Sequence, residues 1–343
     1  MNPKKILIIK PSGIGDIVHA APVAKALKIL YPASEIHWVV FTKFAGIMRC
    51  VEGVDALVKW DRKGGIKEYF RVLGEIRRRR YDIVIDLQGL LRSAFLNRFS
   101  NAANKFSTPL LRELAWLVER PVEKYDPRLH AVERNYRVAE FIARIEGKQI
   151  PAPSELVPWL KVPDREDGIA AVALSKASLP AAFAVASRGR HKIWPAEKFA
   201  ELINRMSDPA ENVAAVTPVL VGSAGERDIA AAVVSKLKRK AVNLVGEISL
   251  PELAGVLKKC RIVVGNDSGV IHIAAALGVP TLGVFGATNP VWYRPYNDKS
   301  AYVYKKCPCS PCDIKTSCRD FKCMKDITVE DVLKKAMDIL GKR

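Results

Sequence analysis

The sequence predicts an α/β protein built from two doubly wound, Rossmann-like domains, each with a parallel sheet. Short apolar runs alternate along the chain with segments of helical period, as is typical of parallel strands covered by helices on both faces. The 343 residues amount to about two domains of roughly 150 residues each. A segment rich in Pro, Glu and Asp, 151–167, lacks a clear period. We therefore expect domains at 1–165 and 166–327 that face each other across a cleft, lined by loops at the carboxyl ends of the strands.

The elements of the first domain follow in order. The apolar runs predict strands at residues 5–9, 36–40, 56–58 and 83–87. Segments of helical period predict helices at 17–30, 66–80 and 132–145. The second of these helices ends in four arginines, 77–80. Cations stabilise the carboxyl end of a helix, and they also attract a protein to an anionic membrane surface, so both interpretations stay open.

The second domain repeats the alternation. Its predicted strands lie at 183–186, 218–221, 242–245, 262–264 and 281–285. The helices between them are expected to begin near Pro195, Ala224, Leu250 and Ser268. A last helix is expected within 328–343, because Thr328 followed three residues later by Asp331 is a start signal. We expect this helix to pack back on the first domain.

The chain is strongly basic, with a net charge of +19 from 55 Lys and Arg against 36 Asp and Glu. The excess is +11 up to residue 165 and +8 beyond it, so it is not a basic tail. Such a balance favours anionic partners, whether nucleic acid, phosphorylated lipid or nucleotide. No run approaches the ~20 apolar residues of a membrane-spanning helix. The opening KKILIIKPSG lacks the core and the cleavage site of a signal peptide, so we expect a cytoplasmic protein.

A glycine-containing loop, Lys-Pro-Ser-Gly-Ile-Gly-Asp, follows the first predicted strand at residues 10–16. Gly13 and Gly15 let the backbone turn sharply and approach a ligand, and the helix that follows offers free N–H groups and a positive dipole end. The loop is not a convincing dinucleotide or triphosphate site, because His19 replaces the third glycine and no Gly-Lys-Ser/Thr follows. Asp16 is either a helix-capping residue or a general base.

Five segments resemble the lipopolysaccharide heptosyltransferases of glycosyltransferase family 9, and together they extend over nearly the whole chain. They are KPSGIGDIVHAAPVAKALKILYP at 10–32, YDIVIDLQGLLRSA at 81–94, HAVERNYRVAEF at 130–141, SRGRHKIWPAEKFAELI at 187–203 and GNDSGVIHIAAALGVPTLGVFGATNP at 265–290. The third is similar to the heptosyltransferase I type in particular. The first and last segments in combination are specific, whereas either alone is a weak signal.

The resemblance implies a GT-B fold and an inverting glycosyltransferase that requires no catalytic metal or other cofactor. It implies that the second domain binds the donor, ADP-L-glycero-D-manno-heptose, and that the first binds the acceptor, the Kdo-lipid A inner core of lipopolysaccharide. The family's catalytic aspartate falls on Asp16, which would take the proton of the attacking hydroxyl. The enzyme would then be cytoplasmic and peripheral, working against the anionic surface of the inner membrane.

The donor residues implied by the resemblance include the family's phosphate-binding lysine, which falls on Lys192. A departing diphosphate gains negative charge, which a cation and oriented N–H donors stabilise where no metal is present. A helix that begins after residues 267–269 would offer such donors. The alternatives are a solvated lysine, an N-cap serine and a buried core histidine. The expected donor residues are Ser187, Lys192, Glu226, Asp267, Ser268, Gly269 and His272.

The acceptor residues implied by the resemblance lie on the first loop, in the Asp-x-Gln-Gly-Leu segment and in basic stretches of the first domain. Arginine forks suit the carboxylates and phosphates of an anionic acceptor. Solvated surface charge is an equally good explanation for each cation in this set. The expected acceptor residues are Ser12, Gly13, Gly15, Arg62, Lys63, Gln88, Arg112 and Arg120.

Five of the seven cysteines fall within residues 307–323. Cys309 and Cys312 have the spacing of a metal knuckle, and Cys318 and Cys323 could complete a site with four thiolates. Such a site would be structural, because it leaves no open coordination position for catalysis. Reduced thiols and disulfides are the alternatives, and a cytosolic location argues against the latter.

Two rival functions remain. The same fold and chemistry could serve another acceptor, such as a later core heptose or a protein, or another nucleotide sugar. The charge also allows a basic nucleic-acid-binding protein, although no such motif is present and no aromatic residues are interleaved in the basic runs. The sequence does not fix the exact acceptor, the stereochemistry of the heptose, the oligomeric state or the state of the thiols.

Overall fold

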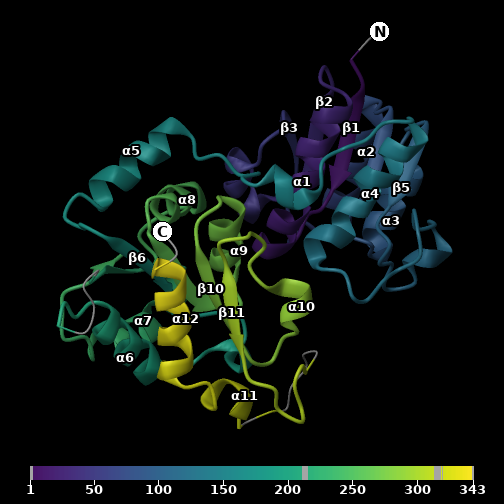
Figure 1. Ribbon diagram of the computed structural model, residues 1–343. Coiled ribbons are helices and arrows are strands. Elements are labelled where there is room, and N and C mark those ends of the chain that lie inside the picture. Colours follow the sequence, from purple (N-terminus) through teal and green to yellow (C-terminus); the bar gives the residue numbers. More distant parts are fainter. Residues whose placement is uncertain (1–2, 211–214, 313–317, 319, 342–343) are drawn as a thin grey trace. The chain divides into compact units, whose positions relative to one another are not determined.

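A computed structural model describes residues 3–210, 215–312, 318 and 320–341 of the chain (Figure 1). The chain divides into two compact units, Met1–Lys161 and Val162–Arg343. The division lies four residues before the predicted boundary at 165. Each unit is an α/β unit with one parallel sheet, as predicted.

The first unit contains a five-stranded sheet in the order β3-β2-β1-β4-β5, and all of its strand pairs are parallel. The strands are β1 (Lys5–Ile9), β2 (Glu35–Phe41), β3 (Ala56–Trp60), β4 (Ile83–Asp86) and β5 (Asn104–Ser107). Residues 6–9 of β1 are fully buried, which explains why this central strand is a continuous apolar run. The edge strand β5 was not predicted; its sequence NKFS is polar and mostly accessible.

Helices cover this sheet, and α1 (Ile14–Leu30) packs against α4 (Ala131–Ile145). A capping box begins α4: His130 Nδ1 accepts a hydrogen bond from the N–H of Val132, and Glu133 accepts one from the N–H of His130. The HAVER segment thus has a structural role. The other helices of the unit are α2 (Gly65–Arg79), α3 (Leu91–Phe99) and the 3-10 turns η1 (Thr42–Phe44), η2 (Ile47–Cys50), η3 (Ala115–Leu117) and η4 (Pro153–Leu156).

The second unit contains a six-stranded parallel sheet in the order β11-β10-β9-β6-β7-β8. Its strands are β6 (Pro180–Ala184), β7 (Thr217–Leu220), β8 (Val242–Asn243), β9 (Ile262–Asn266), β10 (Thr281–Phe285) and β11 (Ala301–Tyr304). The edge strand β11 was not predicted. Its helices are α5 (Asp164–Ala173), α6 (Ala196–Met206), α7 (Arg227–Val234), α8 (Leu250–Lys258), α9 (Gly269–Ala276), α10 (Pro290–Tyr293), α11 (Lys322–Lys325) and α12 (Val329–Gly341), with the turns η5 (Arg190–Lys192) and η6 (Ala224–Glu226).

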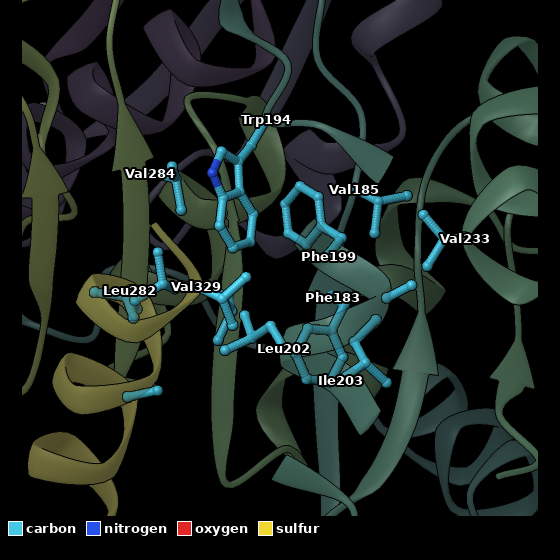
Figure 2. Packing of buried hydrophobic residues seen from close by; sticks show 14 of the residues in the cluster. Phe183, Val185, Trp194, Phe199, Leu202, Ile203, Val233, Leu282, Val284 and Val329 are labelled. Atoms are coloured by element: carbon cyan, nitrogen blue, oxygen red, sulfur yellow. The ribbon is translucent and has the colours of Figure 1, made fainter. Parts of the chain in front are cut away.

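The C-terminal helix α12 belongs to the core of the second unit. Val329, Val332 and Ala336 are buried among residues of α6 and of strands β6, β9 and β10. Figure 2 shows Val329 beside Leu202 of α6 within this cluster. The indole N–H of Trp194 also donates to the carbonyl of Ile327, at 3.0 Å, and ties down the segment that leads into α12. The apolar stripe of the helix is therefore satisfied within its own unit.

Each sheet reverses its strand order at one place, between β1 and β4 in the first unit and between β6 and β9 in the second. At such a switch point, the loops that leave neighbouring strands diverge and leave room for a ligand. Asp16 follows β1 and Gln88 follows β4. Lys192 follows β6 and Asp267 follows β9. The predicted sites thus lie at the switch points of the two sheets.

Candidate active site

The loop between β1 and α1 presents Asp16 to solvent. Gly13 is the N-cap of α1 with a φ of 76°, and no side chain caps this helix. A Cβ on Gly13 would displace the flexible carboxylate of Asp16, and the positive φ is what requires glycine at this position. Asp16 lies in the first turn and is exposed. The capping role that the sequence left open is therefore not what the Asp16 carboxylate does.

Lys10 precedes this loop and is buried. Its ammonium donates to the carbonyl of Leu87, at the end of β4, at 2.5 Å. Burial lowers the pKa of Lys10, and the charges of Asp16 and Asp86 oppose this effect. Lys10 therefore lies within electrostatic reach of the exposed carboxylate of Asp16.

A pair of buried carboxyl groups, Asp86 and Glu119, holds the second loop of this site. Asp86 accepts hydrogen bonds from the N–H groups of Gln88 and Gly89 at 2.7 and 3.2 Å, and from the hydroxyl of Ser93 at 2.7 Å. Burial, then the charge of Asp86, raises the pKa of Glu119 to about 9. Burial raises the pKa of Asp86 as well, so the pair holds one proton at neutral pH in the hydrogen bond between the two side chains. The sequence analysis missed this pair, because its two members lie on different segments.

Several predicted acceptor residues come together around the first loop. The hydroxyl of Ser12 donates to Gln88 Oε1 at 3.1 Å, which joins the loops after β1 and β4. Gly15 lies in the first turn of α1. The N–H of Arg112 donates to the carbonyl of Gly89 at 2.8 Å, and the Arg112 side chain is exposed. These residues therefore form one side of a polar surface next to Asp16.

The remaining predicted cations are less well connected. The guanidinium of Arg62 lies 5.9 Å from the ring centroid of Phe41, the last residue of β2. The side chains of Lys63 and Arg120 are exposed, and the described residues give neither of them an ion pair. The roles of Lys63 and Arg120 in acceptor binding therefore stay predictions.

Arg92 is a cation that the sequence analysis missed. Its guanidinium lies 5.7 Å from the ring of Phe41 and 6.0 Å from that of Trp60. Its Nε is buried and has no hydrogen-bond partner among the described residues. An unsatisfied buried donor is costly, so Arg92 is the residue of this surface best suited to receive an anionic group.

In the second unit, Asp267 is the centre of the predicted donor site. Its Oδ2 accepts from the ammonium of Lys192 at 2.7 Å and from the hydroxyl of Thr288 at 2.8 Å. Its Oδ1 lies 3.4 Å from His272 Nε2, and its carbonyl accepts from the hydroxyl of Ser187 at 2.6 Å. The structure thus brings Ser187, Lys192, Asp267 and His272 together, and it adds Thr288, which the sequence analysis missed.

Asp267 is ionised and fixed in place. It is only 7% exposed. Burial alone would raise its pKa, but the hydrogen bond from His272 and the charge of Lys192 outweigh burial and hold the pKa of Asp267 well below its usual range. The Lys192 side chain keeps 25% of its surface exposed. An ammonium has three donors, so Lys192 remains able to bind an anion while it is anchored to Asp267.

Ser268 and Gly269 form the amino terminus of α9. Ser268 is the N-cap residue, yet its side chain makes no capping hydrogen bond. Its hydroxyl is buried and has no partner among the described residues. A helix amino terminus binds anions through its free N–H groups and its dipole. A buried and unsatisfied hydroxyl at a helix amino terminus is a feature expected of a phosphate site.

Asn266 holds the two loops of the donor site together. This residue is fully buried at the end of β9. Its Oδ1 accepts from the N–H of Trp194 at 2.9 Å, and its Nδ2 donates to the carbonyl of Val185 at 3.0 Å. Residues 185–194, which include Lys192, are therefore pinned to β9. The sequence analysis missed this positioning residue, although it directly precedes Asp267.

Glu226 has a different structural role. It accepts from the N–H of Ser223 at 2.6 Å and completes a capping box at η6. The described residues show no contact between Glu226 and the cluster around Asp267. The structure therefore gives this predicted donor residue a capping function and does not unite it with the others.

The predicted metal ligands Cys309, Cys312, Cys318 and Cys323 lie on both sides of residues that the structure does not describe, so the metal site stays a prediction. All seven cysteines are free. Cys309 is exposed and lies 3.5 Å from Cys307, sulfur to sulfur, whereas Cys323 is buried in the core. Among the described residues, no three Cys, His, Asp or Glu side chains form a group that could hold a metal ion. The segment 313–317, between Cys312 and Cys318, lies outside those residues.

The chain is similar to known proteins over most of its length. Residues 69–322 match the model of glycosyltransferase family 9 (heptosyltransferase). Lipopolysaccharide heptosyltransferase 1 of Pseudomonas aeruginosa is 31% identical over 327 residues, which cover 91% of this chain and 87% of that protein.

Two solved structures have the same fold. A glycosyl transferase of family 9 from Veillonella parvula has a TM-score of 0.81 at 22% identity and covers 99% of this chain and 98% of its own. The ADP-heptose lps heptosyltransferase II of E. coli has a TM-score of 0.79 at 23% identity, with 98% and 99% covered. The fold is GT-B. The protein belongs to glycosyltransferase family 9, the heptosyltransferase family, and is a glycosyltransferase.

Proposed function

We propose that this protein transfers heptose from ADP-L-glycero-D-manno-heptose to the Kdo-lipid A inner core of lipopolysaccharide, with inversion at the anomeric carbon. The observation that carries the proposal is the anion site of the second unit. There, a lysine anchored by Asp267 lies beside an unsatisfied Ser268 hydroxyl at the start of α9. The names of the relatives supply the sugar, since one is an ADP-heptose transferase and another a lipopolysaccharide heptosyltransferase.

The donor site has the groups that a departing ADP requires. As the glycosidic bond to phosphate breaks, the diphosphate gains negative charge. Lys192 supplies a cation, and the N–H groups at the start of α9 supply oriented donors that need no reorganisation. Asp267 and Thr288 keep Lys192 and the loop in position. These groups would stabilise the leaving diphosphate without a catalytic metal.

Asp16 is the proposed general base. The attacking hydroxyl of the acceptor must lose a proton as it bonds to the anomeric carbon, on the face opposite to the diphosphate. The Asp16 carboxylate is exposed at the switch point of the first sheet and has no hydrogen bond or ion pair within the described ranges. It is thus available to accept that proton.

The acceptor is proposed to be anionic and lipid-anchored. Arg62, Arg92 and Arg112 lie around the first loop of the site and would bind its carboxylate and phosphate groups. Such an acceptor would place the enzyme on the cytoplasmic face of the inner membrane as a peripheral protein. No helix in the part of the chain that the structure describes is both long and apolar enough to cross a bilayer.

The test is direct. The purified protein is incubated with ADP-heptose and Kdo-lipid A, and the product is analysed by mass spectrometry and by NMR of the new anomeric centre. One added heptose of inverted configuration, formed in the presence of a chelator, is the expected result. No product under these conditions, together with turnover of another nucleotide sugar or another acceptor in a panel, would instead support the alternative of a related transferase with a different substrate.

A further inference from the structure

Large apolar side chains are exposed on one part of the first unit. The described residues include 13 large hydrophobic side chains that are exposed, and seven of them fall between residues 66 and 117. They lie on α2 and α3, which are labelled in Figure 1, and at η3 or directly before it. Scattered single exposed residues need no explanation, whereas a concentration of this kind marks an interaction surface. The seven are Ile66, Phe70, Phe95, Phe99, Leu114, Trp116 and Leu117.

These three elements are neighbours. The hydroxyl of Tyr69 on α2 donates to the carbonyl of Arg92 on α3 at 3.1 Å, and Asn101, just after α3, donates to the carbonyl of Arg77 at 3.4 Å. Asn97 of α3 donates to Glu119, two residues beyond η3, at 2.8 Å. The three elements are therefore neighbours, and we call the surface that they present the α2–α3–η3 face.

The exposed side chains on this face are held outward by the fold. Phe95 and Phe99 stack with their ring centroids 5.8 Å apart, while Leu96 and Asn97 turn inward and are buried. Glu113 and Leu114, just before η3, have φ values of 53° and 62°. Two consecutive non-glycine residues in the left-handed region are uncommon and strained. This turn leads into Trp116 and Leu117, which are 61% and 64% exposed.

The charge of the face is strongly positive. Helices α2 and α3 together carry seven cations and two carboxylates. Both carboxylates are already paired, Glu68 with Arg71 at 2.7 Å and Glu75 with Arg79 at 2.6 Å. Arg77, Arg78 and Arg98 are exposed and have no ion pair in the described part of the chain. The face thus combines unpaired cations with exposed aromatic and aliphatic side chains.

We propose that the α2–α3–η3 face binds an anionic lipid bilayer, with Trp116, Leu117 and Phe99 inserted among the lipids and the arginines against their headgroups. A bilayer fits this surface, because apolar insertion and cations that contact anionic headgroups act together in peripheral membrane binding. Tryptophan also favours the membrane interface. A second copy of the chain would bring the same cations face to face.

The position of the face suits the proposed reaction. Arg112, whose N–H donates to the carbonyl of Gly89 beside Gln88, lies two residues before Leu114. The insertion residues therefore adjoin the proposed acceptor loop. This argument rests on the proposed function to the extent that the acceptor is lipid-anchored. The apolar and cationic character of the face does not depend on it.

Vesicle flotation of the full chain tests the proposal. The wild-type protein is expected to float with vesicles of phosphatidylethanolamine and phosphatidylglycerol, and to float less with phosphatidylcholine alone or at high salt. The double substitution Trp116→Ser and Leu117→Ser is expected to lower binding about tenfold or more. Arg77→Glu with Arg78→Glu should lower it by about fivefold for each cation lost.

Matched controls lie on the second unit. Val172→Ser removes a side chain that is 76% exposed, and Lys334→Glu with Lys335→Glu makes the same change in net charge on α12. Both controls should bind vesicles as the wild type does. Circular dichroism and ADP affinity, which should be unchanged in all variants, exclude misfolding as the cause of lost binding.

Two results would overturn the proposal. One is vesicle binding by the Trp116→Ser, Leu117→Ser variant that equals that of the wild type. The other is a wild-type protein that does not bind vesicles and instead forms a dimer without lipid, as seen by analytical ultracentrifugation, when the same variant is a monomer. Failure of the proposed function is a separate result, since it appears as no transfer by the wild type to an acceptor dispersed in detergent. The double variant should retain that transfer and lose transfer to acceptor in vesicles.

Discussion

The ammonium of Lys192 lies 2.7 Å from Oδ2 of Asp267, a contact that joins two residues 75 positions apart. The pair lies at the switch point of the second sheet, between the ends of β6 and β9. Asp267 is buried and ionised. Its carboxylate therefore holds the Lys192 ammonium in place by a charge-assisted hydrogen bond. The pair thus prepares a cation for a diphosphate before the donor arrives.

The substitution Lys192→Ala should weaken ADP binding by about 10- to 100-fold, because a hydrogen bond to a charged group contributes roughly 1.5–3 kcal/mol. Isothermal titration calorimetry with ADP measures the effect. Lys236→Ala is the control, since Lys236 is an exposed lysine of the same unit whose carboxylate partner, Glu197, is 3.8 Å away. Equal ADP affinity in the Lys192→Ala variant and the wild type would exclude Lys192 from the phosphate site.

The buried pair of Asp86 and Glu119 should make stability fall as pH rises. Burial raises the pKa of Glu119 to about 9, whereas an unfolded chain has a glutamate pKa near ~4.3. A group whose pKa is raised by folding contributes its full stabilisation when the pH is below its unfolded-state pKa. That stabilisation is lost as the pH rises through its folded-state pKa. The loss between these values is up to about 1.4 kcal/mol per pH unit for one proton.

Glu119→Gln should remove this slope, because the amide donates to Asp86 and does not ionise. Urea unfolding of the wild type and the variant at pH 5 and pH 9, roughly the limits of that window, measures this effect. The free energy of unfolding of the wild type should fall relative to that of the variant as pH rises. Glu113→Gln, an exposed neighbour, should leave the wild-type slope intact. Parallel curves for the wild type and Glu119→Gln would show that Glu119 carries no proton at neutral pH.

Arg92 should matter for the acceptor and not for stability. Its buried Nε has no partner among the described residues, so Arg92→Met should leave the free energy of unfolding unchanged or raised. The same variant should lower kcat/KM for the acceptor by about tenfold or more, since a charged hydrogen bond to the substrate is lost. Its affinity for ADP should match that of the wild type. A loss of stability without a change in acceptor kinetics would make Arg92 a structural residue.

The sequence predicts the buried strands well, but two of the four edge strands, β5 and β11, were not predicted. Strands β1 and β10 lie where continuous apolar runs placed them, because both are buried interior strands of their sheets. Strands β5 and β11 are edge strands with accessible positions. The sequence NKFS of β5 is polar and carries no hydrophobic signal, whereas the apolar sequence AYVY of β11 was overlooked. Helix α5 was likewise hidden, since it begins within the Pro-, Glu- and Asp-rich segment that was interpreted as the boundary.

The site shows the same division between local and distant information. Asp267, Ser268 and Gly269 were found because one strand-to-helix turn contains them all. Their partner Thr288 lies 21 residues beyond Asp267, and no local pattern links the two. Glu226 illustrates the converse, because an acidic residue three positions after a serine is also a capping box. Sequence spacing alone does not separate that role from contact with a ligand.

The account depends most on Asp16 as the base, and parallel measurement of transfer and donor binding in Asp16→Asn tests it most directly. The variant should lose transfer of heptose by about 100- to 10,000-fold, the usual contribution of general-base catalysis. Its affinity for ADP should stay at the wild-type value, because the anion site lies on the second unit. Asp338→Asn, an exposed carboxylate on α12, should behave as the wild type in both assays. Transfer by Asp16→Asn at the wild-type rate would contradict the account.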